Sequence, residues 1–488
     1  MDTLWYEAVS YNWGIMDATE DILVDGCKKK VTRSVYEILT SYSSLFLPKL
    51  LWIDALCIDQ TNDAEKSQQV PLMEKIYLNA IFTTVFLARS PLADGQDKEH
   101  GVQLSHPNLF NILRMHKFRL KYRPEGWNDD YSLRMKGNFD LPNVLEKSSY
   151  FKSTNPRDLI FGVMSLCEKP LNVDYALSVE DIYLAAAERL LGEGASEILF
   201  HSSGVGNIPE EAQLTLTLRS WVPDWRATPN YKRLQNRTRF MGKESFAAGG
   251  QNKLAISVKH HRLLVVSGYL VDKITVLGPA LFDTCHTDHE SIIDETHHLA
   301  ANYAACVRLF FESTRLSASP YPHAETGQSV IEAFRRTLFL DRKWVSWDLS
   351  SDKMIQKFPK WENEMMLFCD RVTLEAYIEK KDAFYKLLKR LYDVTQIIKS
   401  CCGGRRIFIT RNGYIGLCPP YTKQGDLICV VPGLHVPLLL RPDGTKLEYQ
   451  PLSGSTTRVK SVGECYVHGI MNGEALSKGY ALKELEIV

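Results

Sequence analysis

The sequence lacks any long apolar run. None of its apolar stretches reaches the roughly 18–20 residues that a membrane-spanning helix needs. The residues from Met1 to Glu7 also lack the basic and apolar regions of a secretory signal peptide. We therefore expect no membrane insertion and a cytoplasmic location.

The sequence also lacks an excess of charge of either sign. Its 58 lysines and arginines balance 58 aspartates and glutamates. No global field would hold a nucleic acid or an anionic membrane, so we expect no nucleic-acid partner. The 11 cysteines show no paired spacing, which indicates reduced, mostly buried thiols rather than a disulfide framework.

The fingerprints of common cofactor and catalytic sites are missing as well. No Gly-x-Gly-x-x-Gly follows a strand, and neither a Gly-Lys-Ser/Thr phosphate loop nor a Gly-x-Ser-x-Gly elbow occurs. Metal-ligand residue types gather in Cys285-His-Thr-Asp-His289, followed by His297 and His298, but their spacing matches no established zinc motif. We therefore expect no metal and no cofactor.

What is present predicts several domains. With 488 residues, the chain is long enough for two to four units of about 100–200 residues each. Composition and periodicity divide it into an α/β domain over 1–165 whose pattern weakens after residue 88, a mixed connecting region over 166–280, a helical insertion over 281–402, and a small β-rich domain over 403–488.

The first ninety residues alternate short apolar runs with amphipathic stretches, which is typical of a parallel α/β sheet. Strands are predicted over 6–11, 50–53 and 81–88. A hairpin-like piece over 22–26 leads into a helix, and a second helix is predicted over 65–80 with Pro71 in its first turn. The first helix should present one apolar face made of Val31, Val35, Ile38, Leu39, Tyr42 and Leu45.

The rest of the chain alternates between segments predicted to be helical and segments predicted to be β-rich. One helix is expected near 107–120, helical structure over 158–200, and a β-rich segment over 263–278. Long amphipathic helices are predicted between about 290 and 400, and the final ninety residues read as short strands of a small barrel or sandwich.

Three ordered motifs carry a family resemblance. They are Tyr6-Glu-Ala-Val-Ser-Tyr-Asn-Trp-Gly14, Leu51-Trp-Ile-Asp-Ala-Leu-Cys-Ile-Asp-Gln60, and Gln69-Val-x-x-Met-x-x-Ile-Tyr-x-x-Ala80. This series resembles the signature of fungal heterokaryon-incompatibility (HET) domains. Asn155-Pro-Arg-Asp158, Ser220-Trp-Val-Pro-Asp-Trp225 and the segment from Gly463 to Glu474 extend the resemblance over most of the chain. The resemblance implies a fold related to the Toll/interleukin-receptor (TIR) domain, a flavodoxin-like parallel sheet in which some members cleave NAD.

In such a sheet, ligands bind beyond the carboxyl ends of the strands. Tyr11 and Trp13 follow the first strand, and Asp54, Asp59 and Gln60 follow another, so we expect all five at one rim. Asp54 and Asp59 are candidate catalytic carboxylates, and the other three are candidate ligand contacts. Two structural alternatives stay open, because Trp13 is equally compatible with a core position and Asp54 with capping the following turn.

A second group of candidates lies in the two later motifs. These residues combine aromatic rings with polar groups and are expected to line a cleft between the HET-like half and the C-terminal half. The alternative is that they only pack the halves together. The candidate catalytic residues are His468 and Glu474, and the candidate ligand contacts are Trp221, Trp225, Tyr466 and Asn472.

One segment of the family pattern is missing. HET domains typically continue with Trp-Phe-x-Arg-x-Trp-x-x-Gln-Glu, whose glutamate resembles the catalytic glutamate of TIR NAD hydrolases, and residues 88–150 contain no Gln-Glu pair. Glycosidic cleavage needs a carboxylate placed against the developing positive charge, so inherited NAD cleavage is doubtful on the sequence.

Three functional interpretations follow. The first is a divergent HET protein of fungal self/nonself recognition and cell death. The second is a HET-like scaffold recruited as a cofactor-free enzyme of secondary metabolism, a cyclase, isomerase or pericyclase, with a small-molecule ligand in an apolar pocket. The third is a purely scaffolding role. The sequence does not predict an oligomeric state.

Overall fold

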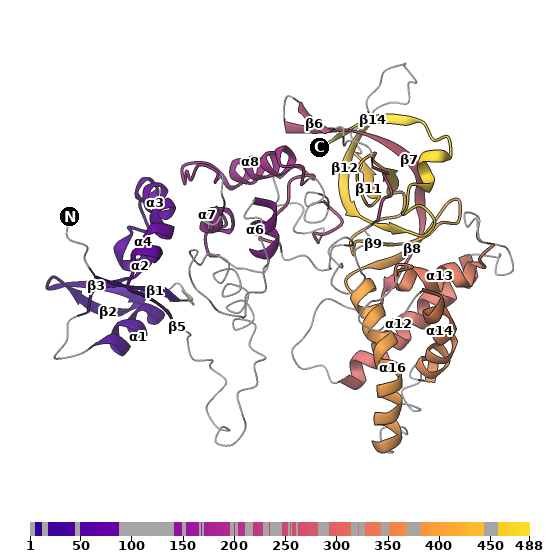
Figure 1. The fold of residues 1–488 in the computed structure, drawn as a ribbon, viewed down its shortest axis with the longest axis horizontal. Coiled ribbons are helices and arrows are strands. Elements are labelled where there is room, and N and C mark those ends of the chain that lie inside the picture. Colours follow the sequence, from indigo (N-terminus) through magenta and orange to yellow (C-terminus); the bar gives the residue numbers. More distant parts are fainter. Residues whose placement is uncertain are drawn as a thin grey trace, which may run out of the picture. The chain divides into compact units, whose positions relative to one another are not determined.

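The computed structural model describes residues 5–11, 18–43, 49–86, 141–148, 153–164, 167, 170–195, 200, 204–209, 218–227, 234, 246–251, 254, 256–259, 262–281, 292–313, 321, 327–342, 351–367, 381–443 and 457–488. The chain divides into two compact units, a first unit over Met1–Ala186 and a second unit over Ala187–Val488 (Figure 1).

The first unit contains a three-stranded parallel sheet in the order β4–β1–β5. Its central strand β1 (Glu7–Tyr11) pairs with β4 (Leu51–Trp52) on one side and with β5 (Phe82–Phe86) on the other. The predicted parallel α/β sheet at the N-terminus is therefore confirmed.

An antiparallel hairpin and a helix follow the central strand. The hairpin joins β2 (Ala18–Val24) to β3 (Cys27–Thr32) through Asp25 and Gly26, whose φ values of 50° and 77° are those of a two-residue type I′ turn. Helix α1 (Arg33–Tyr42) begins after Thr32, whose side chain caps it by accepting a hydrogen bond from the Val35 amide.

The predicted apolar face of this helix needs one correction. Val31 lies in β3, because the cap at Thr32 starts the helix after it. Val35 and Ile38 are buried on the helix as predicted. Leu45 lies outside the described residues.

The predicted helix over 65–80 is divided into three pieces. They are α3 (Asp63–Gln69), a 3₁₀ turn η1 (Val70–Leu72) and α4 (Met73–Asn79). Pro71 lies in the 3₁₀ turn rather than in the first turn of a long helix, because a proline inside an α-helix removes a backbone donor and clashes with the preceding turn.

The described residues between 141 and 195 contain three further helices. They are α6 (Leu141–Ser148), α7 (Asp158–Met164) and α8 (Val179–Gly192), and the dividing point between the two units falls within α8. The helix expected near 107–120 lies outside the described residues.

The described residues of the second unit form a nine-stranded sheet, part of which closes on itself as a barrel. Its strands are β6 (Ile256–Lys259), β7 (Leu263–Ala280), β8 (Arg406–Thr410), β9 (Ile415–Cys418), β10 (Leu427–Val430), β11 (Leu438–Pro442), β12 (Thr457–Glu464), β13 (Tyr466–Val467) and β14 (Leu482–Ile487). The ring runs β10–β11–β12–β14–β7, and an additional β10–β7 pairing closes it. The predicted β-rich C-terminal part is confirmed.

Strand β7 is the longest element of this barrel. Its 18 residues pair with β14 near the start, with β10 in the middle and with β8 near the end. This strand corresponds to the predicted β-rich segment over 263–278, and it lies in the same unit as the strands of the final ninety residues.

Long helices lie beside one part of the barrel sheet. They are α12 (Ile292–Ser313), α13 (Val330–Leu338), α14 (Ser351–Met366) and α16 (Lys381–Cys402), and Figure 1 shows them gathered beside β8 and β9. Buried Tyr303, Phe334 and Trp361 of the helices share one apolar core with Ile407 and Ile415 of the strands. In the described part of the chain, no helix combines the length and the apolar character needed to cross a membrane.

Candidate functional site

The rim predicted in the first unit contains a paired phenol and carboxylate. Tyr11 ends β1, and Asp54 begins the short helix α2 (Asp54–Cys57) two residues after β4. Because β1 and β4 are parallel neighbours, their carboxyl ends lie at the same edge. Burial, followed by the charge of Asp54 and a hydrogen bond to it, raises the pKa of Tyr11 well above its usual range. Tyr11 is therefore a protonated hydrogen-bond donor at this rim.

A backbone amide holds the Asp54 side chain, and Tyr77 of α4 contacts both β1 and β4. The Asp54 carboxylate accepts a hydrogen bond of 2.7 Å from the Ala55 amide. The Tyr77 hydroxyl donates to the Val9 carbonyl at 3.3 Å, and its ring lies edge-on to Trp52 with 5.4 Å between centroids. The rim therefore presents a carboxylate paired with a buried phenol, an arrangement that suits a polar ligand carrying a donor group.

Two other rim candidates make contacts within their own loop. The Gln60 amide donates to the carbonyls of Asp54 and Ile58 at 3.1 Å and 3.3 Å. The exposed Asp59 carboxylate accepts from the side-chain hydroxyl and the backbone amide of Thr61 at 2.7 Å and 2.9 Å, and these bonds lower the pKa of Asp59. Both side chains thus stabilise the turn that precedes α3.

Other candidates of the sequence fall where the structure gives no description. Trp13 lies outside the described residues, and so does the segment from Cys285 to His289. Of the histidines that follow it, His297 and His298 have ring centroids 6.3 Å apart in α12. Within the described residues, no group of three or more His, Cys, Asp or Glu side chains is arranged to hold a metal ion.

In the second unit, Tyr466 and His468 lie together in a buried polar cluster. The Nε2 atom of His468 lies 2.9 Å from the Gln328 Oε1 atom, and its Nδ1 atom lies 3.1 Å from the Tyr466 hydroxyl. Because an amide oxygen only accepts, Nε2 carries the proton and Nδ1 accepts from Tyr466. Burial lowers the pKa of His468, so the imidazole is neutral at physiological pH.

A second tyrosine completes this cluster. The Tyr321 hydroxyl donates to the His468 carbonyl and accepts from the Ile415 amide, both at 3.0 Å. Burial raises the pKa of Tyr321, which keeps the hydroxyl a donor. The cluster joins residues from distant parts of the second unit around one neutral imidazole. Both ring nitrogens of His468 have a hydrogen-bond partner within the protein.

Asn472 and Glu474 serve a local turn. The Glu474 carboxylate accepts from the Asn472 amide at 2.7 Å and from its side chain at 3.4 Å. Gly473 between them has a φ of 95°, and Glu474 starts the 3₁₀ turn η5 (Glu474–Ser477). The structure thus places Glu474 in a partly exposed turn and His468 in the core.

The motif from Ser220 to Trp225 fastens a loop onto the barrel. Trp221 is fully buried and its indole donates to the Arg262 carbonyl at 3.1 Å. Trp225 is 9% exposed. The Ser220 hydroxyl donates to the Val488 carbonyl and accepts from the Ser461 amide at 2.8 Å. All of these contacts lie within the second unit, where Trp221 has a packing role.

A buried ion pair in the same unit joins two residues that were not among the predicted site residues. Arg405 has no exposed surface and Glu464 is 3% exposed, and the Arg405 Nη2 atom lies 2.6 Å from the Glu464 Oε1 atom. The same carboxylate oxygen accepts from the Leu234 amide at 2.9 Å. The sequence gives little signal of this pair, because Glu464 ends β12, a strand that also contains Arg458 and Lys460.

Comparison with known proteins identifies both units. The family model described as heterokaryon incompatibility protein (HET) matches residues 6–134, and the Het-6 beta-barrel domain model matches residues 262–481. The heterokaryon incompatibility protein 6, OR allele, of Neurospora crassa is 37% identical over 71 residues, which are 14% of this chain and 9% of that protein. No solved structure matches this chain.

The matched segments coincide with the architecture described above. The parallel sheet and the Tyr11–Asp54 rim fall within the first matched segment, and β7 to β13 fall within the second. The chain is therefore a member of the HET-domain family, and in this chain the HET match precedes the Het-6 β-barrel match.

Proposed function

We propose that this chain acts in fungal heterokaryon incompatibility, as a signalling or interaction module of self/nonself recognition. The observation that carries the proposal is the ordered match of a HET domain and a Het-6 barrel domain to the two structural units. A relative named for heterokaryon incompatibility supports it over a short segment.

The sheet order supports a TIR-like, flavodoxin-like assignment for the HET domain. The first parallel strand in the chain, β1, lies in the middle of the sheet. The second, β4, lies on one side of it and the third, β5, on the other. This is the beginning of the flavodoxin order, whose ligands bind at the carboxyl ends beside the central strand. The Tyr11 and Asp54 pair lies at that edge.

We assign the signalling role to this rim. The Asp54 carboxylate, paired with the buried Tyr11 hydroxyl, offers an acceptor at the carboxyl ends of β1 and β4, and a donor group of a polar ligand or of a partner would engage it. The proposal does not require NAD cleavage, because residues 88–150 contain no Gln-Glu pair to supply the family's usual carboxylate.

The test is expression of the full chain in a fungal host, with growth and cellular NAD measured together. We expect growth arrest from the wild type without NAD depletion, and loss of the arrest in Asp54→Asn. Asp59→Asn is the matched control, because it makes the same chemical change at an exposed carboxylate that serves its own turn. Melting temperatures of the purified variants establish that both fold.

Two outcomes would reject this assignment. Absence of growth arrest from the wild-type chain counts against the incompatibility function itself. Arrest that Asp54→Asn leaves intact removes the role of the rim, and NAD depletion that accompanies the arrest refutes the non-cleaving mechanism.

A second candidate function is an enzyme of secondary metabolism without a cofactor. It is supported by a pocket of about 620 Å³ in the second unit, which is large enough for an organic substrate. Its lining includes charged side chains, whereas a cyclase or pericyclase was expected to use an apolar pocket. Metabolite profiles of a gene deletion decide this candidate: loss of a defined metabolite supports it, and an unchanged profile excludes it.

A further inference from the structure

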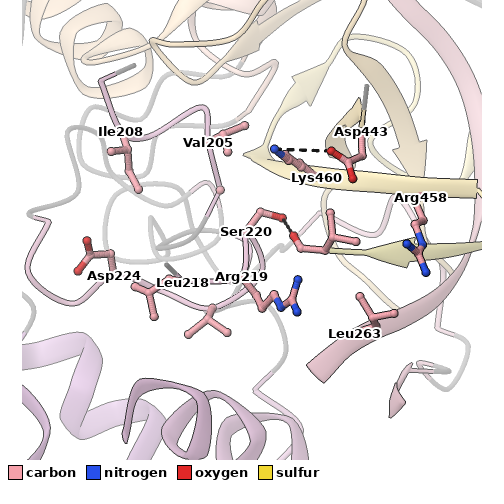
Figure 2. A pocket seen from close by; sticks show the side chains of 13 residues that line it. Val205, Ile208, Leu218, Arg219, Ser220, Asp224, Leu263, Asp443, Arg458 and Lys460 are labelled. Atoms are coloured by element: carbon pink, nitrogen blue, oxygen red, sulfur yellow. Dashed lines mark hydrogen bonds and ion pairs between the residues drawn. The ribbon is translucent and has the colours of Figure 1, made fainter. Parts of the chain in front are cut away.

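The pocket of the second unit is formed by three loops and the edge of the barrel (Figure 2). Its volume of about 620 Å³ lies within the range of small-molecule sites. The lining residues are Gly204, Val205, Ile208, Leu218, Arg219, Ser220, Val222, Asp224, Leu263, Asp443, Arg458, Lys460 and Val488.

One wall is a chain segment pressed closely onto β12. The Val205 amide donates to the Ser461 carbonyl at 2.9 Å, and the Gly206 amide donates to the Val462 carbonyl at 3.0 Å. Gly204 has a φ of +102°, and a Cβ there would lie 2.6 Å from the Val462 backbone. Only glycine permits this approach, so the wall is fixed by backbone contacts.

A second wall is fixed by the motif loop. Ser220 bonds to Val488 through its amide at 3.0 Å and through its hydroxyl, and the same hydroxyl accepts from Ser461. Trp221 anchors the loop in the core. Arg219 therefore projects from a backbone that two neighbouring residues hold in place, and the pocket is preformed.

Basic side chains outnumber acidic ones around this pocket. The basic residues are Arg219, Arg458 and Lys460, and the acidic ones are Asp224 and Asp443. Both carboxylates already have cationic partners, with Asp443 3.6 Å from Lys460 and Asp224 held by Arg226 at 2.7 Å and 3.0 Å.

The two arginines of the lining lie apart from Ile208 and Leu218. Figure 2 shows the guanidinium groups of Arg219 and Arg458 on the side of Leu263, whereas Ile208, Leu218 and Asp224 lie on the other side. The Arg458 Nε atom donates to Glu486 at 3.2 Å. A guanidinium carries five N–H donors, so this contact orients the side chain without using its full capacity.

We propose that this pocket binds a small organic anion. Its carboxylate or phosphate group lies between Arg219 and Arg458, whose planar donors match the oxygens of both groups. Its apolar part contacts Ile208, Leu218 and Val222. The site lies wholly in the second unit and is independent of the function proposed for the Tyr11–Asp54 rim.

Ligand-observed saturation-transfer NMR on the full chain tests this assignment. The probes are phenyl phosphate and benzoate, which distinguish the two anionic groups, and benzylamine, which has the same ring with a positive charge. We expect saturable binding of at least one anion and none of benzylamine. The double variant Arg219→Gln/Arg458→Gln should weaken anion binding by about tenfold or more, since hydrogen bonds to charged groups are among the strong ones.

The matched control is Arg411→Gln, which removes a charge from an exposed arginine outside the pocket lining and should leave binding unchanged. Equal weakening in the control and the double variant overturns the proposal, as does binding of benzylamine equal to that of the anions. Far-ultraviolet circular dichroism reports whether the double variant folds.

A salt titration of the wild-type chain gives a test that needs no variant. Raising sodium chloride from about 0.05 M to 0.5 M shortens the screening length from roughly 14 Å to about 4 Å, so anion binding should weaken severalfold. Binding of the anions that does not change with salt, or no binding of either anion at any salt concentration, overturns the proposal.

Discussion

The Arg405–Glu464 ion pair makes a quantitative prediction about the stability of the second unit. Arg405 is completely buried, Glu464 is 3% exposed, and their atoms approach to 2.6 Å. Glu464→Gln keeps the shape and one acceptor for the Leu234 amide, but it leaves the Arg405 cation without its counter-charge. Removing one member of a buried pair costs about 3–5 kcal/mol of unfolding free energy.

The pair also predicts strong coupling between its two members. Arg405→Met alone leaves a buried carboxylate without its cation, whereas Arg405→Met combined with Glu464→Leu removes both charges. The double variant should therefore be more stable than the sum of the single effects by about 2 kcal/mol or more, because uncompensated charge accounts for most of each single loss.

Thermal unfolding followed by circular dichroism measures these effects. For a unit of this size, about 2 °C of melting temperature corresponds to 1 kcal/mol, so Glu464→Gln should lower the transition by roughly 6–10 °C. Lys259→Met is the control, because it breaks an ion pair of 2.9 Å between half-exposed side chains that is worth about 1 kcal/mol or less. If Glu464→Gln costs no more than this control, the reasoning about burial is refuted.

Three further changes test other parts of the structure. Asn62→Ala removes the N-cap of α3 and should destabilise the first unit by about 1 kcal/mol in urea unfolding; stability equal to the wild type would contradict the cap. Because burial lowers the pKa of His468, the native state resists its protonation, so stability should fall below about pH 6.5, by up to ~1.4 kcal/mol per pH unit. The melting temperature of the wild type should therefore exceed that of His468→Gln by less at pH 5 than at pH 7. An equal difference at the two pH values would contradict the lowered pKa of His468. Ser220→Ala removes the two hydrogen bonds of the hydroxyl, to Val488 and from Ser461, and should cost about 1–3 kcal/mol, measured by denaturant unfolding; a loss below about 0.5 kcal/mol would show that the hydroxyl is dispensable.

The elements of the first unit were largely predictable, and the errors concern where they end. Alternation of apolar and amphipathic segments located β1, β4 and β5, since a parallel sheet needs buried runs separated by helices. Helical spacing alone assigned Val31 to a helix, although Thr32 is a helix cap and ends the strand before it. The proline at position 71 was recognised, but its effect on the continuity of the helix was underestimated.

The candidate rim illustrates what position along a strand does and does not predict. Tyr11 and Asp54 follow neighbouring parallel strands, so their proximity follows from topology. Asp59 and Gln60 also follow β4, yet their side chains make hydrogen bonds within the following turn. Whether a polar side chain bonds to its own loop depends on loop geometry, which the spacing of strands does not predict.

The cluster around His468 sets a different limit. Tyr466 and His468 are two residues apart at a strand, and this spacing places both on one face. Their partners Gln328 and Tyr321 lie about 140 residues earlier in the chain, and no periodicity connects segments at that separation. The protonation state of His468 therefore depends on tertiary contacts that the motif does not contain.

Three consecutive residues of the loop, Arg219, Ser220 and Trp221, have different roles in stability and in ligand recognition. Trp221 fills the core and Ser220 bonds two barrel strands, so changes at either position act on folding. Arg219 precedes them, is exposed, and lines the pocket. Surface positions of this kind usually change stability by less than about 0.5 kcal/mol, while a charge in a pocket changes which ligands enter. The motif from Ser220 to Trp225 therefore builds one wall of the pocket. Arg219, which directly precedes this motif, determines the charge of that wall.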